Sequence, residues 1–378
     1  MPFRVVELER WQSDYEHAVE FNQADSSVRG ASVREVLDPE AMDRLVALEL
    51  GYPMVNGTEP LRRRIAGLYP GARPSQVLVT VGGAEANQII CQALLSPGDE
   101  VVVMQPGYRQ VWGLAQNLGC VVRPFPLLAE RGWRPDLDRL AAMVSPRTRL
   151  IAVVNPNNPT GTILTPAEMR CVIEIAARAG AGCWLLADEV YRGAERYTND
   201  ETPSFWGEHD RVVAVHSLSK AYGLPGLRIG WAVAPEELVQ ELWRRHEYAV
   251  ISAGAPSMLL AELALSEPTR SRLLARQREL MRDGWKLLER WLTENADLVS
   301  VGPSEATAIT FVSYHLPLSS VRLADELRVQ ASVLVAPGEY LGADQYIRLT
   351  HGVGRDRVEP ALDRIAGVLR ELRLRIPA

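Results

Sequence analysis

A lysine amine and several groups that could bind a phosphate occur together in residues 217–230, Ser-Leu-Ser-Lys-Ala-Tyr-Gly-Leu-Pro-Gly-Leu-Arg-Ile-Gly. This stretch directly follows an apolar Val/Ala run with the composition of a buried β-strand. A lysine just beyond a strand end is rigidly placed, and the amine of Lys220 can condense with an aldehyde. Ser217, Ser219 and Arg228 can donate hydrogen bonds and positive charge to a phosphate dianion. A lone lysine in a Gly/Pro-rich loop is more often simply solvated, so the neighbouring motifs decide the interpretation.

Asp188 ends a second apolar run, residues 183–187, and Tyr191 follows three residues later. A carboxylate and a phenol therefore emerge together at one strand end. Glu189 is adjacent, but the alternation of side chains along a strand would point it away from the site. Considered alone, an aspartate at this position is more often the N-cap of a helix.

Two turns after further apolar runs could also contribute. Residues 155–161, Asn-Pro-Asn-Asn-Pro-Thr-Gly, contain Asn158 and are typical of an ordinary loop when taken alone. Gly82, Gly83 and Ala84 lead into a helix, whose free backbone N–H groups and positive dipole end could bind a phosphate. A Gly-Gly turn is weak evidence by itself. The sequence contains no G-x-G-x-x-G, which counts against a dinucleotide-binding dehydrogenase.

These polar residues follow short apolar runs that alternate with helical stretches. Seven runs indicate β-strands, at residues 76–81, 100–104, 121–125, 150–155, 183–188, 211–216 and 229–234. Most are continuously apolar, as in strands buried on both faces, and predict an α/β fold with a largely parallel seven-stranded sheet. Ligands bind at the carboxyl ends of the strands in such sheets.

The pattern changes in the C-terminal part of the chain. Helices and strands there predict an α+β arrangement, with helices at 267–295, 320–330 and 358–372, a strand at 309–313 and two further short strands. At 378 residues the chain exceeds what one hydrophobic core usually supports. We expect a large domain at 45–265 and a smaller domain built from 1–44 and 266–378.

Composition narrows the class of partner. A net charge of −6 disfavours nucleic acid and anionic membranes, which need a clustered basic face, and favours a small-molecule substrate. Cys91, Cys120, Cys171 and Cys183 have no metal-ligand spacing, so we expect buried thiols and no metal site. Acidic residues interrupt the first ten positions, and no apolar run reaches the roughly 18 residues of a membrane span. We therefore expect a cytoplasmic protein with no membrane partner.

At every constrained position, residues 217–230 resemble the pyridoxal 5'-phosphate (PLP) attachment signature of class I/II aminotransferases. The other motifs follow in the family's order, from Tyr52 to Arg348. The resemblance implies the fold type I of PLP-dependent transferases and an enzyme that acts at the α-carbon of an L-amino acid. It also implies that Lys220 carries PLP as a Schiff base and removes the α-proton to give a quinonoid intermediate.

The resemblance also assigns roles to the cofactor-binding residues. Asp188 would pair with the pyridinium nitrogen, Tyr191 with the ring hydroxyl, and Asn158 with that hydroxyl and the substrate carboxylate. The backbone of Gly82, Gly83 and Ala84 would hold the phosphate together with Ser217, Ser219 and Arg228. A side-chain hydroxyl that some relatives have in the Gly82 loop is missing, which increases the dependence on Arg228.

Three further residues match family elements. Tyr108 would stack on the pyridine ring, because its electron-rich face suits an electron-poor ring. Arg348 would bind the substrate α-carboxylate through both guanidinium nitrogens, and its apolar neighbours indicate a strand. Tyr52 would reach the phosphate of the neighbouring subunit, which implies a homodimer with shared active sites.

The motifs leave the reaction open between transamination, which we favour, and elimination of a β-substituent. Relatives that act on dicarboxylic acids have a second arginine near the position of Ala249, and its absence disfavours such substrates. The N-terminal segment carries Glu16, Glu20 and Asp25, which form either a solvated face or a cover over the site. A cationic substrate fits both observations, and 3-hydroxyarginine, eliminated and cyclised in antibiotic biosynthesis, is one candidate. A non-catalytic PLP sensor is disfavoured because no DNA-binding extension or basic face accompanies the motifs.

Overall fold

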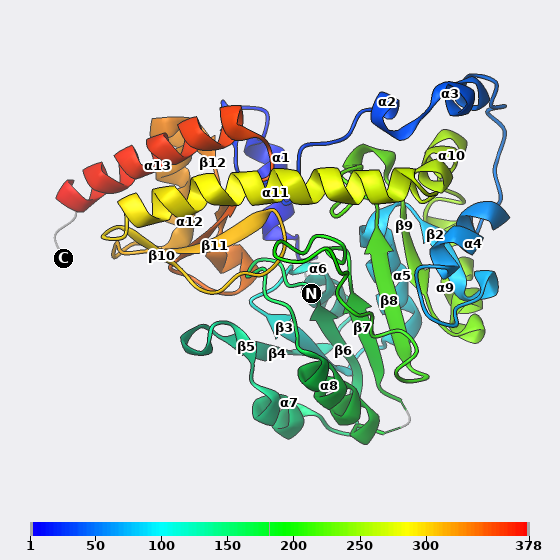
Figure 1. The fold of residues 1–378 in the computed structure, drawn as a ribbon. Coiled ribbons are helices and arrows are strands. Elements are labelled where there is room, and N and C mark those ends of the chain that lie inside the picture. The colour runs from blue at the N-terminus through cyan, green and yellow to red at the C-terminus, as the bar shows by residue number, and fades with distance from the viewer. Residues whose placement is uncertain (1–2, 181, 376–378) are drawn as a thin grey trace.

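The computed structural model describes residues 3–180 and 182–375, and its largest element is an eight-stranded sheet (Figure 1). In spatial order its strands are β2 (Val77–Thr80), β9 (Gly230–Val233), β8 (Val212–Ser217), β7 (Trp184–Asp188), β6 (Thr148–Val154), β3 (Glu100–Gln105), β4 (Val121–Leu128) and β5 (Arg134–Pro135). The strands from β8 to β4 are parallel to one another, whereas β9 is antiparallel to both of its neighbours and β5 to β4.

All seven predicted strands are present in this sheet, and the predicted α/β fold is confirmed. The eighth strand, β5, comprises two residues beside the end of β4. Two residues are too few to give a periodic pattern, which is why the sequence did not indicate this strand.

Both faces of the large sheet are covered by helices. Val101 and Val103 of β3 pack in one core with residues of α5 (Gly82–Leu94), α6 (Gln110–Asn117) and α9 (Glu236–Ala249). Val102 and Met104, which point the other way, pack in a core that includes residues of α8 (Pro166–Arg178) and Leu140 of α7 (Leu137–Met143). This two-sided burial explains why the strands are continuously apolar. No helix within the described ranges combines the length and apolarity needed to cross a membrane.

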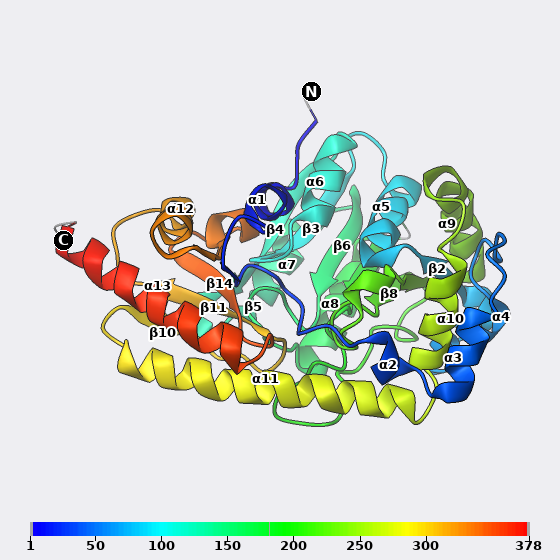
Figure 2. The ribbon, with the colours of Figure 1, turned by 90° about the horizontal axis from the view of Figure 1, so that it is seen from above.

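A second, antiparallel sheet lies beside the first, as Figures 1 and 2 show. Its order is β10 (Val299–Val301), β11 (Ile309–Tyr314), β14 (Tyr346–Thr350) and β13 (Ala336–Pro337). The predicted C-terminal helices correspond to α11 (Thr269–Glu294), α12 (Ser320–Ala331) and α13 (Arg355–Arg375). The long helix α11 runs past both sheets, and α10 (Ala255–Ala264) and α4 (Glu59–Ala66) lie near its N-terminal end (Figure 2).

The N-terminal segment crosses from one sheet to the other. After α1 (Glu7–Tyr15), β1 (Phe21–Asn22) pairs with β12 (Val333–Leu334). Residues 23–28, which we call the N-terminal strap, bond to the backbone of the second sheet through Gln23 and then lead to α2 (Val33–Val36) and α3 (Pro39–Val46) near α10. The division into domains at residues 45 and 266 stays a prediction.

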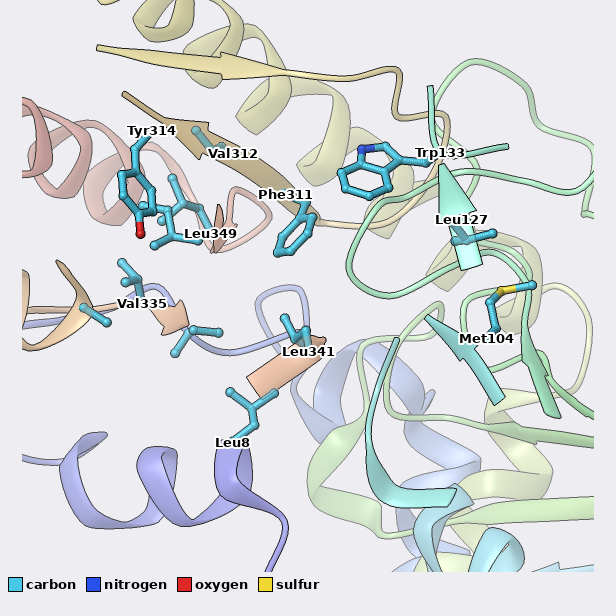
Figure 3. Close-up of a cluster of buried hydrophobic side chains, with 14 of the residues drawn as sticks. Leu8, Met104, Leu127, Trp133, Phe311, Val312, Tyr314, Val335, Leu341 and Leu349 are labelled. Atoms are coloured by element: carbon cyan, nitrogen blue, oxygen red, sulfur yellow. The ribbon is translucent and has the colours of Figure 1, made fainter. Parts of the chain in front are cut away.

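One hydrophobic cluster joins the two sheets (Figure 3). Met104 and Leu127 come from the large sheet, and Phe311 and Leu349 from the second. Trp133 lies between them. Its ring packs edge to face against the ring of Tyr346. The cluster fixes the position of β14 relative to the strand ends of the large sheet.

Gly284 of α11 packs directly against the backbone carbonyl of His351, and a Cβ added there would overlap that oxygen. We expect Gly284→Ala to lower the free energy of unfolding by about 2 kcal/mol or more, because neither backbone can move aside without loss of packing. Gly367 of α13 is the matched control, since open space surrounds its Cβ position. Gly367→Ala should leave stability unchanged or raise it by up to about 1 kcal/mol. Equal melting temperatures for the two variants in thermal unfolding would contradict this packing.

Candidate active site

A cavity of about 240 Å³ opens at the carboxyl ends of β6, β7 and β8. It brings together most of the residues singled out in the sequence, namely Gly83, Ala84, Tyr108, Asn158, Asp188, Tyr191, Ser217, Ser219, Lys220 and Arg228. Gly82 and Arg348 do not line the cavity but contact residues that do, Arg228 and Asn158 respectively. Tyr52 is on the surface. The roles of these residues stay predictions, but their convergence follows from the strand order.

Lys220 lies three residues beyond the end of β8. Its Nζ donates hydrogen bonds to Ser26 Oγ (2.7 Å) and Ser27 Oγ (3.3 Å) of the N-terminal strap. Burial lowers the pKa of the Lys220 amine, and the negative charge of Asp25 opposes this effect. A lowered pKa leaves more of the amine unprotonated and nucleophilic. The other lysine of the sequence, Lys286, is exposed on α11.

Asp188 ends β7 with its carboxylate at the cavity wall. Asn87 Nδ2 donates to Asp188 Oδ2 (3.0 Å), and the backbone N–H of Val190 donates to Oδ1 (3.3 Å). Burial raises the pKa of the Asp188 carboxyl, opposed by these hydrogen bonds and by the charge of Lys220. Glu189 points away, as strand alternation predicted, and accepts hydrogen bonds from Ser204 Oγ and a backbone N–H.

The groups suited to a phosphate lie at the N-terminal end of α5. Arg228 has a left-handed backbone conformation (φ 53°), and its guanidinium donates to Ser219 Oγ (3.4 Å). Gly82, with φ 77°, lies against this guanidinium, and a Cβ added to Gly82 would overlap it. The backbone of Gly83 and Ala84 and the Ser217 side chain complete this end of the cavity. Positive charge, hydroxyls and a helix N-terminus together form a donor set for a phosphate dianion.

Arg348 is fully inside the protein, with 1% of its surface exposed, as its apolar neighbours indicated. Its guanidinium donates to Asn158 Oδ1 (3.0 Å) and to the backbone carbonyl of Ala24 (2.5 Å) in the strap. The Nε atom has no hydrogen-bond partner within the described part of the chain. A buried guanidinium with a free donor is suited to an added carboxylate.

The three tyrosines have different surroundings. Tyr191 Oη donates to the backbone carbonyl of Ser26 (3.3 Å), and burial raises the pKa of Tyr191 to about 12. Tyr108 Oη donates to Glu9 Oε1 (2.9 Å) at the edge of the cavity. Tyr52 is 91% exposed and does not reach this cavity, so its role toward a neighbouring subunit stays a prediction.

Several residues at the site were not identified from the sequence. Asn87 holds Asp188 from the second turn of α5, Ser26 contacts Lys220, and Glu9 contacts Tyr108. The acidic residues of the N-terminal segment indicated that this segment could cover the site. One of them, Glu20, instead pairs with Arg364 on the surface. Within residues 3–180 and 182–375, no group of three or more His, Cys, Asp or Glu side chains is placed to hold a metal ion.

Comparison with known proteins places the chain in a family. The model of aminotransferase class I and II matches residues 45–365. The chain belongs to this family. Capreomycidine synthase of Streptomyces vinaceus is 33% identical over 312 residues, which cover 82% of this chain and 78% of the relative. The arginine–pyruvate transaminase of Pseudomonas aeruginosa is 31% identical over 342 residues, which cover 88% and 86% of the two chains.

A solved structure agrees with this assignment. The PLP-dependent aminotransferase of Streptococcus suis 89-1591 superposes with a TM-score of 0.91 and 29% identity, covering 98% of this chain and 99% of that one. The chain is thus a PLP enzyme of the aminotransferase family, and PLP is its expected cofactor.

The residues of this family member fit the cofactor. The phosphate donor set lies at one side of the cavity, and Lys220, whose amine can condense with the cofactor aldehyde, borders the same space. Asp188 forms no ion pair among the described residues, so a protonated ring nitrogen would give its buried carboxylate a partner. The charges of these residues and their positions along the cavity therefore match the phosphate, the aldehyde and the ring nitrogen of PLP.

We expect wild-type protein to absorb visible light through the cofactor bound to Lys220, and Lys220→Ala to lose this band. Borohydride reduction and peptide mass spectrometry should find the cofactor mass on Lys220 in the wild type. Lys286→Ala is the matched control and should retain both signals, because Lys286 is exposed and paired with Asp283. Covalent cofactor on the Lys220→Ala protein would contradict the assignment.

Proposed function

We propose that this enzyme transfers the amino group of an L-amino acid with a cationic side chain. The carrying observation is the convergence of Lys220, Asp188 and Arg348 around one cavity. PLP, when bound, supplies an electron-poor ring that accepts the electrons of the Cα–H bond. Lys220 would hold PLP at rest and, when its amine is free, would take the Cα proton of the substrate at Nζ. The lowered pKa of Lys220 favours the unprotonated base that this step needs.

Asp188, Arg348 and Asn158 would orient the cofactor and the substrate. Asp188 would keep a proton on the ring nitrogen, and Asn87 holds the Asp188 carboxylate through a hydrogen bond to Oδ2. Arg348 and Asn158 would bind the substrate carboxylate, with the Arg348 guanidinium exchanging its bond to the Ala24 carbonyl for the new partner. A carboxylate fixed on this side orients the Cα–H bond toward Lys220.

The choice of a cationic side chain rests on the acids around the cavity. Glu9 lines its edge, and Asp25 lies close enough to Lys220 to oppose the lowering of its pKa. Ala249 stands at the expected place of the second arginine of dicarboxylate-specific relatives. One relative is named as an arginine–pyruvate transaminase, which supports arginine as the amino donor and pyruvate as the acceptor.

A second candidate function is the elimination of the β-hydroxyl of 3-hydroxyarginine and closure of the guanidine onto Cβ, which yields capreomycidine in antibiotic biosynthesis. The identity of 33% to capreomycidine synthase favours it. Both reactions begin with removal of the α-proton by Lys220, so the residues described above serve either.

The two functions differ in what they consume. With arginine and pyruvate, transamination gives alanine and the keto acid of arginine. With 3-hydroxyarginine, cyclisation gives a product lighter by one water and needs no keto acid. Mass spectrometry of both mixtures distinguishes them, and protein that gives neither product with these or other basic amino acids would refute the proposed substrate class.

We expect Glu9→Gln to raise KM for arginine on the order of tenfold, because the substrate cation loses a charge-assisted partner. KM for methionine, a long side chain without charge, should change little. Glu16→Gln is the matched control, since Glu16 lies just beyond α1, contacts His17 and does not line the cavity. An equal effect on both substrates would mean that Glu9 acts only by holding Tyr108.

We further propose that the enzyme is a homodimer with shared active sites and that it works in the cytoplasm. Several large apolar residues are exposed on two neighbouring segments: Val46, Leu50, Tyr52 and Met54, and Tyr248, Val250 and Ile251. The hydrogen bond between His246 Nε2 and the carbonyl of Val55 (3.0 Å) holds these segments together. Exposed apolar residues on two segments that contact each other favour an interface, which would carry Tyr52 to the partner. Four unpaired cysteines favour a reducing compartment.

We expect Tyr248→Glu to shift the protein toward monomer in sedimentation velocity, because a charge would enter the apolar surface. Tyr248 is 96% exposed in the single chain, so the monomer fold should not suffer. Val329→Glu is the matched control on α12, far along the chain from this surface and 64% exposed. Wild-type protein that sediments as a monomer at micromolar concentration would refute the dimer.

A further inference from the structure

A buried histidine and carboxylate lie together beneath the N-terminal end of α5. His246 of α9 has none of its surface exposed, and its Nδ1 is 2.7 Å from Glu85 Oε1. The other carboxylate oxygen, Oε2, accepts the backbone N–H of Val81 (2.5 Å), the residue just before α5. His246 Nε2 contacts the carbonyl oxygen of Val55 at 3.0 Å. These contacts tie α5, α9 and the loop before α4 to one point.

The chemistry of the partners fixes the charges of this pair. The carbonyl oxygen of Val55 can only accept, so Nε2 of His246 carries a proton. Nδ1 and Glu85 Oε1 share a second proton, and we assign it to the imidazole because imidazole is the stronger base of the two in water. This assignment gives a buried pair of opposite charges.

This pair lies where its charge matters for a phosphate. Glu85 is in the first turn of α5, next to the backbone of Gly83 and Ala84 at the cavity. A carboxylate there would repel a phosphate dianion, and the His246 cation offsets this repulsion. Glu85 also accepts a hydrogen bond from the Val81 N–H, and this bond fixes the backbone that leads into the Gly82 turn.

The Gly82 turn has little freedom to adjust on its own. A Cβ added to Gly230 of β9 would overlap the backbone between Gly82 and Gly83, and one added to Gly82 would overlap Arg228. The turn is thus enclosed by β9 on one side and Arg228 on another. Glu85 holds its start through the hydrogen bond from the Val81 N–H. A small displacement of the Val81 backbone would therefore move the N–H groups that face the cavity.

We propose that His246 and Glu85 are positioning residues for the cofactor phosphate, with Glu85 setting the backbone of the Gly82 turn and His246 cancelling the charge of Glu85. This inference rests on the proposed role of the Gly82 turn in holding PLP. Neither side chain touches the cavity, so both act through the backbone and through their charges.

The test compares the binding of PLP with that of pyridoxal, which lacks the phosphate, to the full-length apoenzyme by fluorescence titration. His246→Gln leaves the Glu85 carboxylate without a counter-charge and should weaken PLP on the order of tenfold while pyridoxal binds as in the wild type. Glu85→Gln should weaken PLP less, because the amide oxygen still accepts one of the two hydrogen bonds.

The double variant Glu85→Gln/His246→Gln gives the sharpest outcome. It contains no uncompensated charge, so it should bind PLP more tightly than His246→Gln alone. A double variant no tighter than this single variant, or equal weakening of PLP and pyridoxal in the single variants, would overturn the proposal in favour of a structural role.

A control separates this effect from the loss of any buried ion pair. Glu195 is buried and pairs with Arg278 (3.0 Å) in another part of the molecule, so Glu195→Gln should leave the ratio of PLP to pyridoxal affinity unchanged. A changed ratio there would also count against the proposal. Wild-type protein that forms no covalent adduct with either ligand would instead refute the proposed function itself.

Discussion

Lys220 and Asp188 are largely shielded from water at the ends of two neighbouring parallel strands, and the strands and the strap around them maintain this shielding. The carboxyl ends of β7 and β8 bring the two side chains to one edge of the sheet. Burial pushes the pKa of the amine down and that of the carboxyl up, so each is closer to its neutral form than in water. A bound cation beside Asp188 would reverse this for the carboxyl. The hydrogen bonds from Asn87 and Val190 thus leave the charge of Asp188 without a cationic partner among the described residues until the cofactor provides one.

The extent to which the sequence predicts this site depends on how far apart the contacting residues are in the chain. Lys220, Ser217 and Arg228 occur in one stretch, and the strand ends that carry Asp188 and Asn158 are continuous apolar runs. Ser26 contacts Lys220 across 194 residues, and no local pattern connects them. The role of Asn87 could not be predicted for the same reason. It lies in a helix that packs on the sheet, and its partner Asp188 becomes apparent only when β7 is placed beside that helix.

The N-terminal strap is the part of the site on which family resemblance is least informative. It bonds to Lys220, Tyr191 and Arg348 at once, using two hydroxyls and two backbone carbonyls. If Arg348 binds the substrate carboxylate as proposed, the carbonyl of Ala24 occupies a guanidinium donor that the carboxylate would use, and the strap competes with the substrate. KM would then depend on the difference between two sets of hydrogen bonds, and the sequence of the strap could change it without any change to Lys220 or Asp188.

The scarcity of lysine has a practical consequence. Lys220 is half-buried and bonded to the strap, and Lys286, on the exposed side of α11, is the other side-chain amine of the sequence. Guanidinium groups, which provide the remaining positive side chains, react poorly with activated esters. Of the two lysine side chains, a fluorophore ester would therefore attach to Lys286. The enzyme can thus carry a probe on its long helix without a designed cysteine, and the orientation of α11 during turnover becomes measurable by anisotropy.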